Sequence, residues 1–284
     1  MTSTIENLSF PLTVVILARN EQQNIGRCVG AVRWCSEVVV IDDGSTDQTV
    51  QIAEAAGARV LQHKFESFAA QRNWAMERAS LRNEWVLHLD ADEVMTPELQ
   101  KALMANLSEV PPEVAAFRMC RKTMLSETWL KYSDGFPVWI MRLVKRGQAQ
   151  FVSSGHGEVA VPTVDGVMGT IREPFLHFAF SKGWADWIER HNRYSSREAM
   201  LEEERDHTIA WDGLISFDKA QRRAALRGLS RQLPFRSLFR FLYQYLFKLG
   251  FLDGRAGYTF CRMMAIYEYW IVLKRCERRR EITS

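Results

Sequence analysis

The stretches Val38-Val39-Val40-Ile41-Asp42-Asp43-Gly44 and Trp85-Val86-Leu87-His88-Leu89-Asp90-Ala91-Asp92 decide the fold that this sequence predicts. Each is a short apolar run that ends in acidic residues, and residues 13–18 form a third apolar run. Short runs rich in β-branched residues are typical of buried strands. The pattern predicts strands that alternate with helices along the front of the chain.

We expect strands at 13–18, 37–41, 58–62 and 85–89, and helices at 22–33, 47–56 and 67–80. Such alternation is typical of an α/β fold with a mostly parallel central sheet that is flanked by helices. Further strands are expected at 114–119 and 138–144, and Thr96 followed by Pro97 is a typical start of a helix. From residue 183 onward the pattern becomes helical.

The composition is that of a folded globular chain. The 284 residues are 47% hydrophobic and 25% charged, which excludes wholesale disorder. The five cysteines form no CxxC pair, so we expect neither a zinc knuckle nor a disulfide framework. No uncharged apolar run approaches the ~18 residues of a membrane-spanning helix, and the first residues do not resemble a signal peptide. We therefore expect a cytoplasmic protein.

Basic residues are concentrated at the C-terminal end. Residues 219–284 hold 15 lysines and arginines against 4 acidic residues, although the whole chain carries a net charge of only +3. An acidic front joined to a basic, aromatic tail indicates different partners for the two parts. The partner of the tail should be anionic. Because no nucleic-acid-binding motif accompanies the charge, we expect a lipid surface and no nucleic acid.

Polar side chains follow three of the expected strands, as Arg19-Asn20-Glu21, Asp42-Asp43 and Asp90-Ala91-Asp92. The carboxyl ends of parallel strands meet at one edge of the sheet, where ligands bind in such folds. Two carboxylates one residue apart in extended backbone can reach Mg²⁺ or Mn²⁺, or an ion and a ribose together. The alternative for a single Asp-x-Asp pair is a solvated acidic turn. The second acidic pair at a neighbouring strand end favours a binding site.

The residues from Gly44 to Asp47 have a simpler explanation as a turn and helix cap. That explanation does not cover Asp42 and Asp43, whose adjacent charges repel at the end of a buried strand. A carboxylate there could accept hydrogen bonds from a nucleobase or a ribose. Arg72 is by default a solvated helical arginine, and it becomes a site residue if the pocket needs a cation for a diphosphate.

Several enzyme classes are disfavoured because their motifs are absent from the sequence. No GxGxxG follows the first strand and no GxxxxGK[ST] occurs, which disfavours a dinucleotide dehydrogenase and a P-loop NTPase. No serine lies in a GxSxG motif, which disfavours an α/β-hydrolase.

In order and spacing, the segments 17–21, 40–47 and 89–93 resemble motifs of the family 2 glycosyltransferases. That family consists of inverting enzymes on the GT-A fold, which binds nucleotide sugars. The resemblance implies that Asp43 contacts the nucleotide base, Asp90 the ribose, and Asp92 a Mg²⁺ or Mn²⁺ ion that bridges the diphosphate. It also implies that Arg72 lies near the nucleotide. Together with the polar clusters at the strand ends, the candidate donor-binding residues are Asn20, Glu21, Asp42, Asp43, Arg72 and Asp90.

The later part of the chain is similar to the lipopolysaccharide core glucosyltransferase-like branch of that family. The matching elements are His156 with Glu158, His177, Tyr194-Ser195 and the stretch Gly250-Phe251-Leu252-Asp253-Gly254. In this chain Gly157 separates His156 from Glu158, where the branch has adjacent His-Glu. The candidate metal ligands are Asp92, Asp90 and His177, although His177 follows an apolar run and is equally well explained as a core histidine.

Inverting transfer needs a base at the acceptor hydroxyl. Glu158 is the first candidate, and the alternative for its segment is a polar hairpin turn. Asp134 is the rival base, although Asp134-Gly135 is also an ordinary turn. We expect transfer of a sugar from a nucleoside diphosphate to a lipid-linked or lipopolysaccharide-core-type acceptor, by a protein peripheral on the inner face of the cytoplasmic membrane.

Three other functions remain as alternatives. A polyprenyl-phosphate glycosyl synthase has the same fold, but its attacking phosphate oxygen needs no strong base. A sugar-nucleotide nucleotidyltransferase would need a glycine-rich, arginine-containing loop after the first strand, which Ala18-Arg19-Asn20-Glu21 is not. An inactive, membrane-tethered nucleotide-sugar-binding module would be expected to have lost its acidic pairs.

The C-terminal region predicts amphipathic helices. Within 235–249 a polar residue recurs at every fourth position among aromatic and aliphatic ones, at Arg236, Arg240, Gln244 and Lys248. The spacing predicts one narrow polar stripe on a helix with Gly250 as its C-cap. Helices with a basic stripe and aromatic flanks lie on anionic membranes; the alternative is that they pack on the catalytic domain.

We therefore expect two domains. Residues 1–182 form the catalytic domain, with a nucleotide-sugar-binding half at 1–110 and an acceptor half at 111–182. Residues 183–284 form a helical, basic region associated with the membrane.

Overall fold

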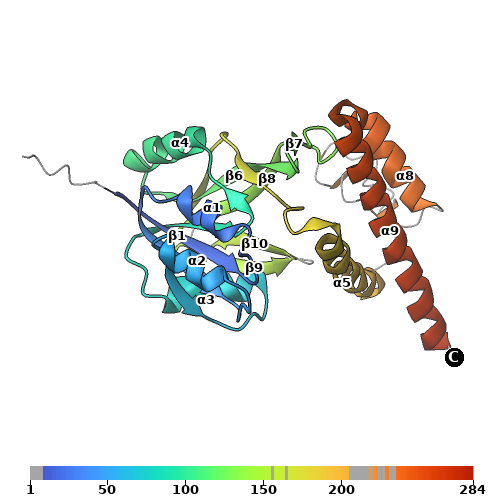
Figure 1. Cartoon of the computed structure of the whole chain (residues 1–284). Coiled ribbons are helices and arrows are strands. Elements are labelled where there is room, and N and C mark those ends of the chain that lie inside the picture. Colours follow the sequence, from blue (N-terminus) through green and yellow to red (C-terminus); the bar gives the residue numbers. More distant parts are fainter. Residues whose placement is uncertain are drawn as a thin grey trace, which may run out of the picture. The chain divides into compact units, whose positions relative to one another are not determined.

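The computed structural model describes residues 9–154, 157–163, 166–204, 218, 221–222, 225, 228–229 and 235–283. The chain divides into two compact units (Figure 1). Unit 1 comprises Met1–Trp129 and Phe136–Lys182, and unit 2 comprises Leu130–Gly135 and Gly183–Ser284. Unit 1 holds the sheet, and the regular elements that the structure describes in unit 2 are helices and helical turns. The short segment Leu130–Gly135 therefore belongs with helices that follow it much later in the chain.

Parallel strands form the first half of the sheet, in the order β3-β2-β1-β4. The elements are β1 (Phe10–Ala18), α1 (Ile25–Gly30), β2 (Cys35–Asp42), α2 (Thr49–Ala55), β3 (Arg59–Gln62), α3 (Phe68–Arg78) and β4 (Trp85–Asp90). The alternating pattern of strands and helices is confirmed. Helix α1 is shorter than the expected 22–33, because the residues before it form a loop that is bonded to the segment after β2.

The second half of the sheet is mixed and continues in the order β4-β8-β6-β12-β5. Strand β8 runs antiparallel to both β4 and β6, and β12 runs parallel to β6. A separate hairpin joins β9 to β10. The elements are β5 (Glu93–Val94), α4 (Pro97–Ser108), β6 (Val114–Leu125), β7 (Thr128–Trp129), β8 (Val138–Lys145), β9 (Ala149–Ser154), β10 (Gly157–Pro162), β11 (Val167–Thr170) and β12 (Phe175–His177).

Both faces of the sheet are buried, as the near-continuous apolar strands predicted. In β1 the side chains of Val14 and Ile16 belong to one core cluster, and those of Val15 and Leu17 belong to the other. Successive side chains of a strand point to opposite faces, so the two clusters lie on the two sides of the sheet. Helix α4 begins as predicted, because the Thr96 hydroxyl accepts the Leu99 amide hydrogen bond and Pro97 occupies the first turn.

Unit 2 contains α5 (Gly183–Glu204), α8 (Arg236–Leu242), a π-helical turn η1 (Tyr243–Phe247), a 3₁₀ turn η2 (Gly250–Asp253) and α9 (Gly254–Thr283). The prediction that Gly250 caps a helix spanning 235–249 is wrong. Leu249 adopts the left-handed conformation instead, with φ 61°. Gly250 is packed so closely that a Cβ there would lie 2.7 Å from the carbonyl oxygen of Gln244. Glycine is needed at this position for close packing.

Two of the four side chains in the predicted polar stripe, Arg236 and Gln244, face the interior of unit 2, whereas Lys248 is exposed. Arg236 is buried and pairs with Glu202 on α5 and Glu268 on α9. Gln244 is also buried, and its amide donates to the carbonyl oxygen of Ser133. Where the sequence suggested a stripe directed at a membrane, Arg236 instead joins α8 to α5 and α9, and Gln244 joins η1 to the Leu130–Gly135 segment.

None of the helices among the described residues has an apolar stretch long enough to cross a bilayer.

A buried histidine on β4 makes the stability of unit 1 depend on pH. The His88 ring is fully buried, packs edge-on against Phe151, and has no hydrogen-bond partner for either nitrogen in the described part of the chain. Burial lowers its pKa well below the usual value of 6.5, and the charges of Arg72 and Arg142 lower it further, although Asp90 opposes them. His88 therefore stays neutral in the folded protein at pH values where the unfolded chain binds a proton.

Because the unfolded state then binds more protons, the free energy of unfolding decreases as the pH falls below 6.5. Between pH 7 and pH 5, the buried neutral His88 alone should lower the free energy of unfolding by about 2 kcal/mol. When the free energy of unfolding is measured in urea at both pH values, it should decrease from pH 7 to pH 5 by about 2 kcal/mol less in His88→Phe than in the parent protein. The same loss in the variant as in the parent protein would contradict the neutral, buried state of His88.

Candidate active site

The carboxyl ends of β2 and β4 lie on either side of β1. Ala18 is paired with Asp42 on one side, and Leu17 is paired with Asp90 on the other. The ladder continues for one more bond on each side, from the Asp43 amide to Ala18 and from the Ala91 amide to Leu17. The acidic pairs that follow the two strands therefore start from the same edge of the sheet, as the sequence predicted.

The loop after β1 is bonded to the loop after β2. The Asn20 side-chain oxygen accepts a hydrogen bond from the Thr46 backbone amide at 2.8 Å, and the Asn20 backbone amide donates to Ser45 Oγ at 2.8 Å. Asn20 has a φ of 51°, a left-handed conformation that asparagine tolerates better than most residues. Gly44 also has a positive φ, which agrees with the predicted turn. Asn20 thus fixes the shape of the two loops at this edge.

Asp42 and Asp43 are adjacent but have different surroundings. Asp42 is fully buried, and its carboxylate accepts bonds from the amide and the hydroxyl of Ser45. The side chain of Asp43 is 13% exposed; it accepts the Phe65 amide bond at 2.8 Å and pairs with Arg19 at 2.9 Å. Asp42 therefore stabilises the turn, whereas Asp43 presents a positioned carboxylate at the surface of the site.

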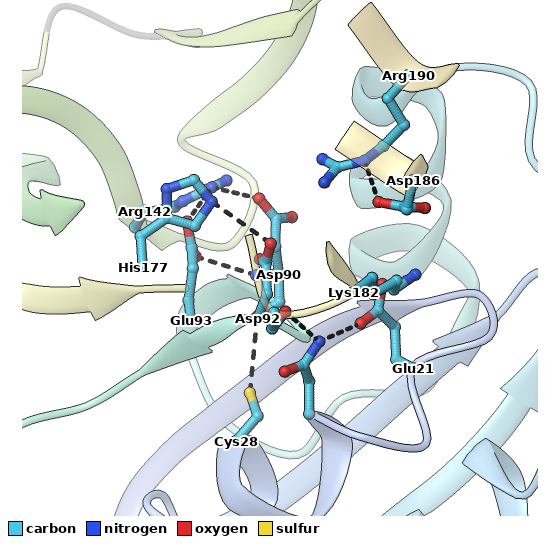
Figure 2. A network of polar contacts seen from close by, with 12 residues as sticks. Glu21, Cys28, Asp90, Asp92, Glu93, Arg142, His177, Lys182, Asp186 and Arg190 are labelled. Atoms are coloured by element: carbon cyan, nitrogen blue, oxygen red, sulfur yellow. Dashed lines mark hydrogen bonds and ion pairs between the residues drawn. The ribbon is translucent and has the colours of Figure 1, made fainter. Parts of the chain in front are cut away.

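Two buried arginines each bind one carboxylate oxygen of Asp90, an arrangement we call the arginine clamp (Figure 2 shows its Arg142 part). Arg72 Nη2 lies 2.6 Å from Asp90 Oδ1, and Arg142 Nη2 lies 2.6 Å from Asp90 Oδ2. Arg142 also lies 2.7 Å from the buried Glu93, which accepts the Asp90 amide bond at 3.0 Å. Burial alone would raise the pKa of Asp90, but the two guanidinium groups outweigh it and hold that pKa below its usual range.

Asp92 and His177 form the second part of this cluster (Figure 2). Asp92 Oδ2 lies 3.5 Å from His177 Nε2, and the two side chains are 18% and 16% exposed. His177 Nδ1 is buried and has no hydrogen-bond partner among the described residues. No three histidine, cysteine or acidic side chains gather around one point in the ranges that the structure describes. An ion here would therefore have two protein ligands and would take its other ligands from a bound substrate.

Such a site fits Mg²⁺ or Mn²⁺, because these ions commonly bind through one or two carboxylates together with substrate phosphates. The imidazole of His177 lies within reach as a nitrogen ligand, since only 3.5 Å separates it from the Asp92 carboxylate.

The Glu21 carboxylate is bonded to other side chains of unit 1. Its carboxylate pairs with Lys182 at 2.5 Å and accepts a bond from Asn24 at 2.7 Å, and Asn24 also donates to Ser181. Burial raises the pKa of Glu21, the bonds to Lys182 and Asn24 oppose that rise, and the charge of Asp92 adds to it. Glu21 thus joins the loop after β1 to the end of unit 1.

The two candidate bases belong to different units. Glu158 lies on β10 opposite Ser153 in unit 1, and its side chain and the whole of His156 lie outside the described residues. Asp134 belongs to the Leu130–Gly135 segment of unit 2 and is half-buried. Asp253 holds that segment, because its carboxylate accepts bonds from the Ser133 amide and hydroxyl at 2.8 and 2.7 Å and from the Tyr132 amide at 3.0 Å. The Gly250–Gly254 stretch is thereby explained as an anchor.

Three residues of this network were not among the candidates from the sequence: Arg142, Glu93 and Lys182. Arg142 had a usable signal, because it is a charged residue inside the apolar run 138–144 and a buried arginine requires an acidic partner. Lys182 had no such signal in the sequence, because its partner Glu21 lies more than half the chain away.

The glycosyl transferase family 2 model matches residues 13–159, just over half of the chain. The lipopolysaccharide core biosynthesis glycosyltransferase LpsC of Rhizobium meliloti is 28% identical over 196 residues, which are 66% of this chain and 70% of that protein. A glycosyltransferase of Rickettsia bellii is 36% identical over 96 residues, which are 34% of this chain and 32% of that protein.

Two solved structures are also similar. Staphylococcus aureus TarS 1–349 is 15% identical with a TM-score of 0.43, over 89% of this chain and 90% of that one. The glucosyl-3-phosphoglycerate synthase of Mycobacterium tuberculosis in complex with phosphoglyceric acid is 18% identical with a TM-score of 0.46, over 67% and 78% of the two chains.

The family match includes the strands and acidic motifs from β1 to β4 on which the resemblance was based. Together with the α/β sheet of unit 1, it confirms the predicted GT-A fold, and the match to LpsC confirms the likeness to the lipopolysaccharide core branch. This chain belongs to glycosyl transferase family 2.

Proposed function

We propose that this protein transfers a sugar from a nucleoside diphosphate sugar to a lipid-linked or lipopolysaccharide-core-type acceptor, with inversion at the anomeric carbon and at the inner face of the cytoplasmic membrane. The observation that carries the proposal is the Asp92–His177 pair beside the arginine clamp on Asp90. Family membership supports a nucleotide-sugar donor. The likeness to LpsC, whose name assigns it to lipopolysaccharide core biosynthesis, supports the acceptor class.

The nucleotide end of the donor would bind at Asp43 and Asp90. The Asp43 carboxylate is held in place by the Phe65 amide and by Arg19, so it can accept hydrogen bonds from a nucleobase without moving. The Asp90 side chain remains 31% exposed within the arginine clamp. Because the clamp keeps Asp90 ionised, it can accept bonds from the ribose hydroxyls. Asn20, Glu21 and Asp42 would then support the shape of the site rather than touch the donor.

The diphosphate needs positive charge that the two clamping arginines do not supply. Arg72 is fully buried and Arg142 almost so, and each is paired with Asp90. Asp92 and His177 would hold a divalent cation, Mg²⁺ or Mn²⁺. When bound, the ion neutralises the charge that develops on the departing nucleoside diphosphate. Asp90, whose oxygens face the arginines, would not be a ligand.

The transfer is a single displacement. The base removes the proton of the acceptor hydroxyl while its oxygen attacks the anomeric carbon, and the bond to the diphosphate breaks with its electron pair leaving on the phosphate oxygen. A base is worth ~10²–10⁴-fold in rate. We assign this step to Glu158, with Asp134 as the second candidate because Asp253 fixes its loop.

Asp92→Asn should abolish metal-dependent transfer, because the amide is a weaker ligand for a hard cation than the carboxylate. Thermal stability would be measured with UDP-, GDP-, CMP- and dTDP-sugars, with and without Mn²⁺. The parent protein should be stabilised by one donor only when Mn²⁺ is present, and Asp92→Asn should lose that stabilisation while its melting temperature without ligand is unchanged. Glu109→Gln, an exposed acid directly after the C-terminal end of α4, is the control. Retained Mn²⁺-dependent binding in Asp92→Asn would remove Asp92 from the site.

Glu158→Gln should lower transfer at least ~10²-fold and leave donor binding intact, because the amide cannot accept the acceptor proton. Asp134→Asn, made in parallel, should have a much smaller effect. If the effects are reversed, Asp134 is the base. If neither variant loses activity, the attacking group needs no strong base, and a phosphate acceptor of the polyprenyl type replaces the hydroxyl acceptor.

A further inference from the structure

One side of α8 and of the two turns that follow it is covered with exposed apolar side chains, which we call the apolar face. The exposure of these side chains ranges from 42% at Leu249 to 79% at Phe247. The residues of the apolar face are Phe235, Leu238, Phe239, Tyr243, Leu246, Phe247, Leu249, Phe251 and Leu252. Soluble proteins rarely expose so many neighbouring large apolar side chains, and such patches mark surfaces that bind a partner or a membrane.

The orientation of α8 is fixed by its polar side. Arg236 forms ion pairs with Glu202 and Glu268 on two other helices, and Arg240 donates to Gln244, which is itself bonded to Ser133. A surface helix of a soluble protein normally buries its apolar side and exposes its polar side. Here Arg236 and Gln244 on the polar side are buried and bonded within unit 2, so the helix cannot turn its apolar face inward without breaking these bonds.

A groove of about 440 Å³ lies between α8 and α9, which pack side by side (Figure 1). Its walls include Leu238 and Phe241 from α8 and Ile266 and Tyr269 from α9. Leu238 belongs to the apolar face as well, so groove and face are continuous. The groove contains one cationic side chain, Arg262, whose guanidinium donates to the Tyr258 hydroxyl at 3.2 Å.

The excess of basic residues in the segment that carries the apolar face indicates an anionic partner. Residues 235–262 contain five lysines and arginines and a single acid, Asp253. The Asp253 carboxylate already accepts bonds from Tyr132 and Ser133, whereas Lys248, Arg255 and Arg262 are exposed. A second copy of this chain would bring the same cations against them. An anionic lipid surface offers both the apolar layer and the opposite charge.

We propose that the apolar face inserts into the interfacial layer of an anionic bilayer, and that the α8–α9 groove takes one acyl chain of a phospholipid whose phosphate contacts Arg262. The proposal deepens the proposed function, on which it rests for the presence of a membrane-borne acceptor. Aromatic and aliphatic side chains on one side of a helix enter the headgroup boundary by ~5–10 Å. Lys248, Arg255 and Arg262, which are exposed and close in sequence to residues of the apolar face, then contact the anionic headgroups.

The test is co-sedimentation of the full chain with phosphatidylcholine vesicles and with vesicles that also contain phosphatidylglycerol. The parent protein should bind the anionic vesicles more tightly, and salt should weaken that binding. Phe239→Ser/Phe247→Ser should bind at least ~10-fold more weakly, because two large apolar side chains no longer enter the lipid. The control is Met104→Ser/Met168→Ser, which removes two exposed apolar side chains from unit 1. Equal binding by the two double variants would overturn the proposal.

Two further variants test the groove. Arg262→Gln should weaken binding to the anionic vesicles about fivefold, since each basic residue at such a surface contributes on the order of 1 kcal/mol. Arg33→Gln, an exposed arginine of unit 1, should have no such effect. Ala265→Trp should fill the groove and weaken binding to both kinds of vesicle. If Ala265→Trp binds as the parent protein does, no acyl chain enters the groove.

The failure of this proposal can be told apart from the failure of the proposed function. Transfer to a lipid-free oligosaccharide acceptor should be unchanged in Phe239→Ser/Phe247→Ser, because these residues lie outside the catalytic machinery. Vesicle binding without any transfer activity would contradict the function alone. A parent protein that sediments as a dimer, becomes monomeric in the double variant and binds no vesicles would show that a second copy covers the apolar face.

Discussion

Three acidic side chains follow one another at the end of β4 and the start of β5, and the site depends on how their charges are balanced. Asp90 and Glu93 share Arg142, and Asp90 also pairs with Arg72. Removing one partner from such buried ion pairs would leave an uncompensated charge, which is strongly destabilising. Since Arg142 comes from the antiparallel strand β8, the same ion pairs join the two halves of the sheet. Both arginines are therefore paired with acidic side chains of the site itself. The remaining acid, Asp92, lies next to His177.

Much of this edge could be predicted because its signals are local. The strands β1, β2 and β4 are short apolar runs, and the carboxyl ends of parallel strands necessarily meet at one edge. The strand pairings Ala18–Asp42 and Leu17–Asp90 agree with that rule. The start of α4 could be predicted from two residues, because a threonine cap and a proline in the first turn act within four residues. The likeness to glycosyl transferase family 2 rests on the same local motifs.

The bonding partners of these residues could not be predicted, because they are distant in sequence. Arg142 and Asp90 are 52 residues apart, and Asp253 is 120 residues from Ser133. Composition gives no means of choosing among many possible acidic and basic pairs. The sequence likewise did not indicate the partner of Asp42. It was a candidate for binding the nucleotide, but it is fully buried and its carboxylate accepts a hydrogen bond from Ser45. The side chain of Glu158 lies outside the described residues, so its assignment as the base stays a prediction.

Helix α8 marks the limit of pattern analysis most clearly. Its periodicity placed Arg236 and Gln244 on one side of the helix. It did not indicate that this side is covered, since that depends on Glu202 and Glu268 from other helices. Burying Arg236 with these acids carries a desolvation cost that an apolar contact would not. Leaving the apolar face in water also forgoes about 25 cal/mol for each Å² that stays uncovered. An arrangement that is unfavourable in water on both counts becomes favourable when the outer medium is itself apolar. The orientation of α8 therefore supports the proposal that its apolar face enters a lipid surface.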